Sequence, residues 1–215
     1  MTELALGAFL TLFVVMDPVG VAPMFLALVG DRPRAEQRRV ARKAVLVAGI
    51  VLFGFAFAGG SLLRTLGISI DAFRIAGGIL LFRIAVGMVL AAPHQRETEE
   101  EERESRARAD VSVFPLAIPL IAGPGALASM MILVGQAGAD ARRLTLVLAM
   151  AAVVLGLTWI ALWLAEPLGR ALGRTGVNVV TRVLGVLLAA LAVQYVADGA
   201  RALLGIGLGA SPPPI

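Results

Sequence analysis

Residues 14–25 read VVMDPVGVAPMF and interrupt an otherwise apolar N-terminal segment. They include one carboxylate, Asp17, and three residues that disfavour a regular helix, namely Pro18, Gly20 and Pro23. Each proline removes a backbone N–H donor and the glycine loosens the hydrogen-bond ladder, so the stretch predicts a break in a helix. Whether that break lies inside a membrane depends on the rest of the sequence.

The composition indicates a polytopic membrane protein. Of the 215 residues, 59% are hydrophobic and 16% are charged, whereas about 25% of residues are charged in a typical soluble domain. The chain has no cysteine and a single histidine, His94, in a polar loop, which excludes disulfides and thiolate metal sites and predicts no metal or cofactor. The net charge of +4 comes mainly from arginines in short loops, so membrane topology explains it better than a nucleic-acid partner does.

Six apolar segments are each long enough to cross a bilayer as a helix. Because backbone N–H and C=O groups need partners inside lipid, the predicted fold class is all-α, with breaks only where the backbone is buried in protein or lines a cavity. The first segment lacks a basic leader and a small-residue cleavage site, so it is expected to be a span and not a signal peptide. The predicted spans are Leu4–Val29, Ala44–Leu63, Ile70–Ala91, Val111–Val134, Leu144–Leu168 and Val177–Ala197.

Basic residues predict the orientation of these spans. The first, third and fifth loops hold twelve basic residues, and the opposite face holds four. By the positive-inside rule the odd-numbered loops face the cytoplasm, so both termini lie outside the plasma (inner) membrane. The acidic run from Glu97 to Glu104 is interpreted as a solvated connector, with a binding site as the alternative.

Two pairs of segments echo each other across the chain. LGISIDAFRIAGGILLF (residues 66–82) and TGVNVVTRVLGVLLA (residues 175–189) share Arg-x-x-Gly followed by an aliphatic run, and DPVG (residues 17–20) corresponds to GPG (residues 123–125). Repeats of three spans enter the membrane in opposite senses, which predicts inverted two-fold symmetry, with the first and fourth spans broken at mid-membrane. The predicted units are a first repeat (1–92), a cytoplasmic charged linker (93–110), a second repeat (111–203) and a short tail (204–215).

With these motifs the chain resembles the MarC family of integral membrane proteins, which includes proteins described as small neutral amino-acid transporters. The matching motifs are MDPVG (residues 16–20) with Pro23 and Phe25, RIAGGILL (residues 74–81) and IPLIAGPGA (residues 118–126). The resemblance covers nearly the whole chain and implies six spans in two halves and transport of glycine, alanine or serine. Two positions depart from the family's pattern: Val21 stands where asparagine is usual, and Arg83 where an aliphatic residue is expected.

The two breaks supply the candidate substrate site. Half-helix junctions offer amides at the positive end of a helix dipole for a carboxylate, and free carbonyls for an ammonium group or an ion. We assign the amides of Gly125, Ala126 and Leu127 to the carboxylate, and the carbonyls near Asp17 and Val19 to the cation. For either break alone, a proline kink is the alternative. The candidate substrate-binding residues are Asp17, Pro18, Val19, Gly20, Val21, Gly123, Pro124, Gly125, Ala126, Leu127 and Ser129.

Four charged residues are candidates for coupling or gating. Asp17 and Arg83 are expected at similar depths in spans that run the same way. Either they form an ion pair that orients two helices, or Asp17 senses a coupling H⁺ or Na⁺ or holds the substrate amine. Arg74 and Arg182 are expected near the outer ends of the third and sixth spans, where they snorkel to the interface or form a symmetric gate.

Several small residues have structural alternatives to a role in binding. The Ser129 hydroxyl faces the cavity or bonds back to its own helix. Ser69 and Asn178 are good N-cap types for the helices that follow them. Gly77, Gly78 and Gly185 are expected to permit close helix packing.

These features favour a secondary transporter that moves a small neutral amino acid by alternating access, driven by an ion gradient or by exchange. The alternatives are an exporter or channel for another small solute, or a non-transporting membrane scaffold. An intramembrane enzyme is not predicted, because the sequence has no HExxH, no Gly-x-Ser-x-Gly and no histidine within a span. The expected partners are the amino acid, the lipid bilayer and an H⁺ or Na⁺ ion, and assembly into a homo-oligomer stays open.

Overall fold

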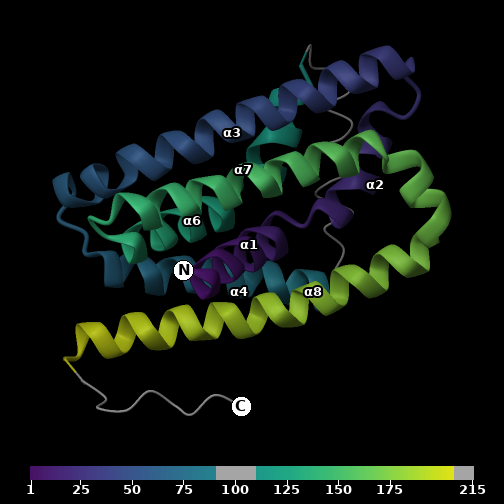
Figure 1. Cartoon of the computed structure of the whole chain (residues 1–215). Helices are drawn as coiled ribbons and strands as arrows, with labels where there is room; N and C mark the ends of the chain where they lie inside the picture. Colours follow the sequence, from purple (N-terminus) through teal and green to yellow (C-terminus); the bar gives the residue numbers. More distant parts are fainter. Residues whose placement is uncertain (91–109, 206–215) are drawn as a thin grey trace.

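The computed structural model describes residues 1–90 and 110–205, and this part of the chain is helical with no strand. Figure 1 shows elongated helices lying side by side. The predicted linker (93–110, apart from Asp110) and most of the predicted tail (204–215) lie outside the described residues. The elements are α1 (Thr2–Met16), α2 (Pro18–Val29), α3 (Arg34–Thr65), α4 (Ile70–Leu90), η1 (Ser112–Ile121), α6 (Pro124–Ala137), α7 (Ala141–Trp163) and α8 (Ala165–Leu203).

The described helices agree with a multi-pass membrane protein. Five are long and apolar enough to cross a bilayer, and they become six if the bent pair η1 and α6 is one span. The α1 and α2 helices count together as one 28-residue span, Thr2–Val29. The prediction of an all-α chain is therefore confirmed, and the described helices supply five or six of the six predicted spans.

Some predicted boundaries were wrong by several residues. The α3 helix begins at Arg34, ten residues before the predicted span, because a helix rich in basic residues continues beyond the apolar stretch. The predicted fifth span runs past the end of α7 at Trp163. The α8 helix begins at Ala165 and bends at Gly173, whose φ of 60° is a left-handed conformation that glycine tolerates.

Local signals explain where several helices begin. The Asp140 carboxylate accepts hydrogen bonds from the amides of Arg142 (2.9 Å) and Arg143 (3.3 Å) and so caps α7. The Ser69 hydroxyl accepts a hydrogen bond from the Ala72 amide (3.1 Å), as expected of an N-cap for α4. Asn178 does not begin a helix, because α8 already started at Ala165.

The α4 and α8 helices form a closely packed antiparallel pair. A Cβ added at Gly78 would lie 2.7 Å from the Ala192 carbonyl oxygen, and one added at Gly199 would lie 2.7 Å from the Asp71 carbonyl oxygen. At the other end of the pair, Gly185 lies against Met88. Glycine therefore permits backbone contact between these helices, as expected for membrane spans.

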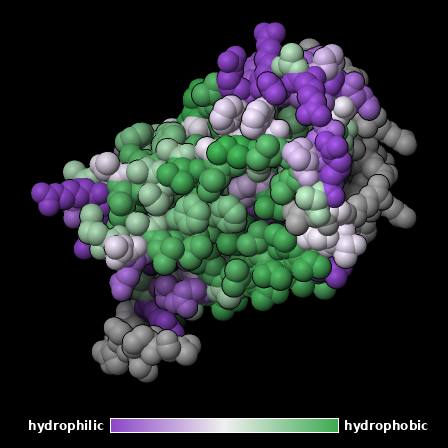
Figure 2. Space-filling model, turned by 45° about the vertical axis from the view of Figure 1, so that its right-hand side comes forward, coloured by the Kyte–Doolittle hydropathy of each residue, from purple (hydrophilic) through white to green (hydrophobic). Residues whose placement is uncertain are grey.

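The remaining helices pack around a separate apolar core. Its fully buried members include Leu12 of α1, Phe25 of α2, Leu52 of α3, Met130 of α6 and Leu162 of α7. The outer surface is apolar as well: Figure 2 shows a broad hydrophobic face between hydrophilic ends. Large apolar side chains that face outward include Leu6, Leu46, Ile50, Phe57, Ile79, Val183, Val186 and Val193. An apolar face of this kind is what contact with lipid requires.

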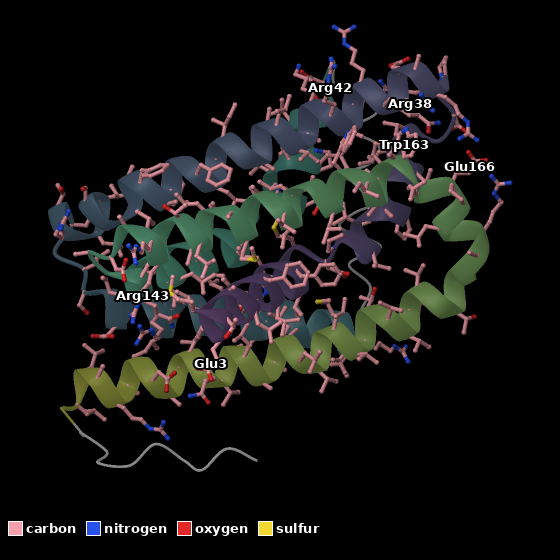
Figure 3. All side chains as sticks on the ribbon, in the orientation of Figure 1. Glu3, Arg38, Arg42, Arg143, Trp163 and Glu166 are labelled. Atoms are coloured by element: carbon pink, nitrogen blue, oxygen red, sulfur yellow. The ribbon has the colours of Figure 1, made fainter. Side chains whose placement is uncertain are left out.

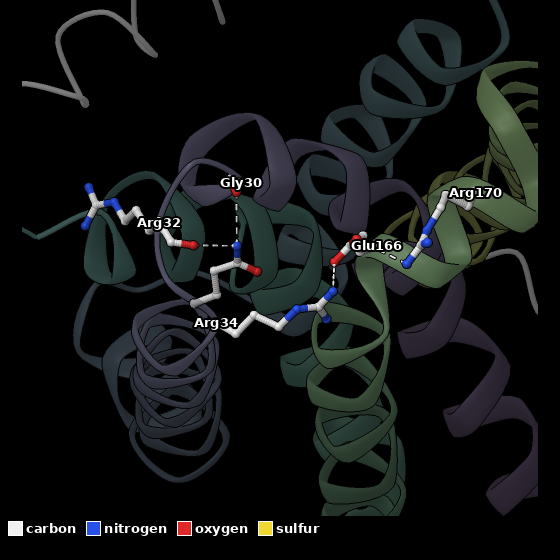
Figure 4. Close-up of polar contacts among 6 residues, drawn as sticks. Gly30, Arg32, Arg34, Glu166 and Arg170 are labelled. Carbon is white, nitrogen blue, oxygen red and sulfur yellow. Dashed lines mark hydrogen bonds and ion pairs between the residues drawn. The ribbon is translucent and has the colours of Figure 1, made fainter.

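Ion pairs gather the odd-numbered connections at one end of the molecule. Arg34, the first residue of α3, contacts Glu166 in the first turn of α8, and Arg170 also contacts Glu166 (3.1 Å). Figure 4 shows the Glu166 carboxylate between the two arginines. Lys43 pairs with Asp110, at the end of the third connection, and this contact holds the pKa of the Asp110 carboxyl below its usual range. The prediction that these connections share one face is confirmed for the described residues.

Figure 3 shows the two polar ends of the molecule. Arg38, Arg42 and Glu166 lie at the end that the odd-numbered connections share, whereas Glu3 and Arg143 lie toward the opposite end. At the first end the Arg38 guanidinium stacks over the Trp163 ring, 5.3 Å from its centroid. A cation over an indole at the edge of an apolar band is favourable, because the ring can lie in the interface while the charge stays in water.

Candidate functional site

The first interruption lies at Asp17, between α1 and α2. Asp17 has φ 40° and ψ 66°, and among the described residues it is the one non-glycine residue with a positive φ. Its amide still donates to the Phe13 carbonyl (3.0 Å), while its carboxylate accepts from the Gly20 amide (3.0 Å). Asp17 thus ends one helix and caps the next, and aspartate is among the side chains that best tolerate this conformation.

This geometry explains the Asp-Pro-x-Gly motif. Pro18 occupies the first position of α2, where a missing N–H costs nothing because that amide has no partner within a helix. At Gly20 an added Cβ would lie 2.1 Å from the Asp17 Oδ2 atom, so a larger residue would displace the carboxylate. The negative charge also lies at the positive end of the α2 dipole. Asp17 therefore has a structural role in the helix break, whatever else it does.

Asp17 and Arg83 do not form an ion pair. Arg83 is exposed on α4, whereas Asp17 is half-buried, and within the described part of the chain the Asp17 carboxylate accepts one hydrogen bond, from Gly20. The ion-pair alternative of the sequence analysis is therefore wrong for this structure. Val21, the other departure from the family pattern, is buried in the apolar core, and its amide donates to the Asp17 carbonyl (3.0 Å).

The second interruption lies between η1 and α6, which meet at 54°. The backbone of η1 is extended at Phe114 and Ile118, and Gly123 is the extended residue before α6. Pro124 occupies the first position of α6, as Pro18 does in α2, but no side chain caps α6. Both breaks place a proline at the first position of the helix that follows, but a carboxylate caps only α2.

The amides at the start of α6 meet the expectation only in part. The Leu127 amide donates to the Gly123 carbonyl (3.0 Å), so in this conformation it is not free for a substrate carboxylate. Gly125 and Ala126 lie in the first turn, where amides have no acceptor inside a helix. Both residues are buried.

Apolar side chains occupy the space beside the second break. A Cβ added at Gly125 would lie 2.7 Å from Leu81 Cδ2, 3.2 Å from Ile84 Cδ1 and 3.4 Å from Val15 Cγ1. A side chain does not fit at Gly123, because an added Cβ would lie 2.4 Å from the Pro119 carbonyl oxygen of the preceding turn. In the described conformation these glycines therefore permit packing, where the sequence analysis expected room for a ligand.

The two interruptions belong to helices that touch. The α1 helix packs against α6, and α2 contacts η1. The interrupted segment of each half thus lies beside that of the other, although roughly a hundred residues separate the two motifs in sequence. Two surface hollows lie at the polar end that contains Arg38 and Lys43, and neither is lined by Asp17 or by residues of α6.

The two arginines of the repeated motif lie at opposite ends of the α4 and α8 pair. Arg74 lies beside Asp71 (3.3 Å between Nη1 and Oδ1), at the level of Gly199, whereas Arg182 precedes the contact of Gly185 with Met88. The expectation that both arginines lie near the outer ends of their spans was wrong. The α4 and α8 helices run in opposite directions, so the same motif in each helix lies at opposite ends of the pair. Arg182 is exposed, and Arg74 is largely buried.

A buried group of polar side chains lies among α1, α4, α6 and α8. The Tyr195 hydroxyl is within reach of the hydroxyls of Thr11 and Ser129, and the positive charge of Arg74 acts on it. Gly78, one turn after Arg74, lies against Ala192 and Val196 on either side of Tyr195. Ser129 is 0% exposed, and its Oγ has no hydrogen-bond partner, so it does not bond back to its own helix. Ser129 and Arg74 were among the residues predicted from the sequence, whereas Thr11 and Tyr195 were not. The one signal for them was a hydroxyl within an apolar span, and Tyr195 is the only tyrosine in the chain.

No group of three or more histidine, cysteine, aspartate or glutamate side chains within the described ranges is placed to hold a metal ion. The polar groups described above in the interior of this part of the chain are the Asp17 carboxylate, the Arg74 guanidinium and several hydroxyl groups, together with the amides at the start of α6.

Comparison with known proteins agrees with this architecture. A family model described as "MarC family integral membrane protein" matches residues 2–204. A UPF0056 membrane protein of Methanocaldococcus jannaschii is 36% identical over 201 residues, covering 92% of this chain and 96% of that protein. A UPF0056 membrane protein of Escherichia coli is 35% identical over 199 residues (91% of each chain), and one of Bacillus subtilis is 33% identical over 197 residues (91% of this chain and 93% of that protein). These names state no substrate and no enzymatic activity. No solved structure matches the chain.

Proposed function

The chain belongs to the MarC family of integral membrane proteins, and from this premise we propose that it is a secondary transporter of small neutral amino acids such as glycine, alanine and serine. The observation that carries the proposal is the contact between the two interrupted segments, α1 with α6 and α2 with η1. In secondary transporters, substrates bind where discontinuous helices of two repeats meet near the bilayer midplane.

The proposed architecture is a pair of inverted repeats, residues 1–92 and 111–203, with the first and fourth spans broken at mid-membrane. The antiparallel packing of α4 against α8 supports it, as does the placement of Arg74 and Arg182 at opposite ends of that pair. A symmetry axis in the membrane plane would interchange these two helices and these two ends. Alternating access then requires one repeat to rock against the other, and the close packing beside Gly125 marks a contact that such a movement would open.

We place the protein in the inner membrane with both termini outside. The proposal rests on the excess of basic residues at the end shared by the odd-numbered connections. In the described part of the chain that end carries Arg32, Arg34, Arg38, Arg39, Arg42, Lys43 and Arg170, and the opposite end carries Arg64, Arg142, Arg143 and Arg201.

Counterflow in liposomes tests the transport proposal. Purified protein is reconstituted into liposomes preloaded with unlabelled glycine, alanine or serine, and entry of the labelled amino acid is measured. We expect faster entry than into protein-free liposomes. Counterflow at the protein-free rate for all three amino acids would refute the amino-acid assignment, whereas uptake without any stimulation by a preloaded solute would indicate a channel.

The same assay tests the charge of Asp17. Asp17→Asn keeps an N-cap of similar quality but removes the charge, so we expect impaired counterflow with little loss of stability. Asp140→Asn is the matched control, because Asp140 caps α7 at the surface in the same way. Varying pH and Na⁺ separates proton coupling, sodium coupling and plain exchange. Equal counterflow by the two variants and the wild type would exclude a coupling or binding role for the Asp17 charge.

A further inference from the structure

Four side chains from four helices make up what we call the buried polar group: Thr11 of α1, Arg74 of α4, Ser129 of α6 and Tyr195 of α8. Thr11, Ser129 and Tyr195 are 8%, 0% and 5% exposed, and the Arg74 side chain is 17% exposed. The surroundings are apolar and include Leu81, Ile132 and Leu188. Polar atoms buried in an apolar interior normally form hydrogen bonds with one another.

Two atoms of the buried polar group have no partner. Ser129 Oγ and Arg74 Nε are buried, and neither forms a hydrogen bond within the described part of the chain. Leaving buried polar atoms unpaired costs stability, so each such atom in a native structure calls for an explanation. Thr158 shows the ordinary solution elsewhere in the fold, because its buried hydroxyl donates to the Val154 carbonyl one turn back (2.9 Å).

The free groups are suited to an anion. Arginine stays protonated in proteins and donates from its guanidinium in a planar fork that matches a carboxylate. The contact with Asp71 involves Nη1 at 3.3 Å and leaves Nε free. The hydroxyls of Thr11, Ser129 and Tyr195 each carry one O–H that can donate to a ligand. A singly charged, planar ligand that accepts several hydrogen bonds fits one cation and three hydroxyls.

We propose that the buried polar group formed by Arg74, Tyr195, Ser129 and Thr11 binds the carboxylate of the transported amino acid. This inference rests on the proposed function and deepens it, since it moves the carboxylate site from the α6 amides to side chains at the meeting point of four helices. It also gives a physical reason for relative movement of the two repeats, because Thr11 and Arg74 belong to the first half and Ser129 and Tyr195 to the second. A ligand held by both halves stabilises the conformation in which they are closest.

Counterflow with matched hydroxyl variants tests the proposal. Thr11→Val and Thr158→Val each remove one buried hydroxyl at nearly constant volume, but only the first lies in the buried polar group. We expect Thr11→Val, Ser129→Ala and Tyr195→Phe each to raise the half-saturating alanine concentration roughly tenfold, the usual weight of one hydrogen bond to a charged group. Thr158→Val should leave it unchanged. For the guanidinium, Arg74→Lys should raise it at least tenfold. Arg201→Lys is the exposed control, because Arg201 pairs with Asp198 three residues earlier, as Arg74 pairs with Asp71.

A second measurement does not depend on transport. Thermal unfolding of the detergent-purified protein is followed with alanine, with alaninamide (which lacks the carboxylate), with propionate and with inorganic phosphate. We expect alanine and propionate to raise the melting temperature of the wild type and of Thr158→Val, and alaninamide and phosphate to have no effect. In Ser129→Ala and Tyr195→Phe the shift should disappear at the same ligand concentration. A melting temperature close to that of the wild type without ligand shows that a variant is folded.

The outcomes separate this inference from the proposed function. Wild-type counterflow with unchanged half-saturation in all four variants of the buried polar group would overturn the carboxylate site and leave the transporter standing. Stabilisation by propionate without counterflow would support the site and refute the amino-acid transporter. Stabilisation by phosphate in place of propionate, or by neither, would overturn the carboxylate assignment.

Discussion

Gly78 provides the sharpest test of the packing between α4 and α8. A Cβ at this position would lie 2.7 Å from the Ala192 carbonyl oxygen and 3.1 Å from the Val196 amide nitrogen. Both are backbone atoms of α8, so they cannot rotate aside as the end of a side chain could. Gly78→Ala must therefore push the two helices apart, or strain them.

The expected magnitude follows from two opposing effects. Overpacking a well-packed interior costs about 1–3 kcal/mol, whereas replacing glycine by alanine inside a helix gains about 0.5–1 kcal/mol. Gly156→Ala in α7 is the matched control, because a Cβ there meets no atom within 4 Å. The helix gain is common to both variants, so the difference between them measures overpacking alone, and we expect Gly78→Ala to be less stable by about 1–3 kcal/mol.

Unfolding by SDS in mixed micelles, followed by circular dichroism, gives the free energy of unfolding of both variants. Gly78 lies one turn after Arg74, and Ala192 lies one turn before Tyr195, so separation of the helices should also weaken alanine counterflow in Gly78→Ala only. Equal unfolding free energies for Gly78→Ala and Gly156→Ala would refute the close backbone contact and the antiparallel register that depends on it.

Two further predictions concern the breaks. Asp17→Ala should lower the free energy of unfolding by about 1 kcal/mol through loss of the α2 cap, and Asp17→Asn should lower it much less; SDS unfolding of both variants checks this, and equal losses would contradict the capping role. Gly125→Ala should destabilise less than Gly78→Ala, by about 1 kcal/mol, because its Cβ would lie 2.7 Å from Leu81 Cδ2, the end of a side chain that can shift. Combined with Leu81→Ala, the double variant should be more stable than the sum of the single losses, and strict additivity in the same assay would show that the two side chains do not meet.

The motifs predicted the places of the breaks but only part of their chemistry. Asp17 and Pro18 do interrupt a helix, because a proline at the first position and an aspartate before it act locally in any context. The Gly-Pro-Gly turn likewise precedes a helix that begins at Pro124. What those residues face is not local. The motif predicted room for a ligand beside Gly125, whereas Leu81 and Ile84 of α4 lie there.

The pairing of charges could not be predicted from depth in the membrane. Asp17 and Arg83 were expected at similar depths, but Arg83 points outward from α4 and the two form no ion pair. Depth fixes one coordinate of a side chain, and rotation of the helix about its axis fixes the other. For α4, whose apolar residues surround the whole helix, the sequence pattern gives no clear direction for that rotation.

The sequence by itself determined that this chain inserts in a membrane as helices, where the spans lie and where two of them are interrupted. These properties follow from hydropathy and from the backbone chemistry of proline, glycine and aspartate, which act over a few residues. Only the tertiary structure decided that Thr11, Arg74, Ser129 and Tyr195 share one buried place. They come from four helices far apart in sequence, and their meeting depends on the helix rotations that close packing at residues such as Gly78 and Gly199 selects.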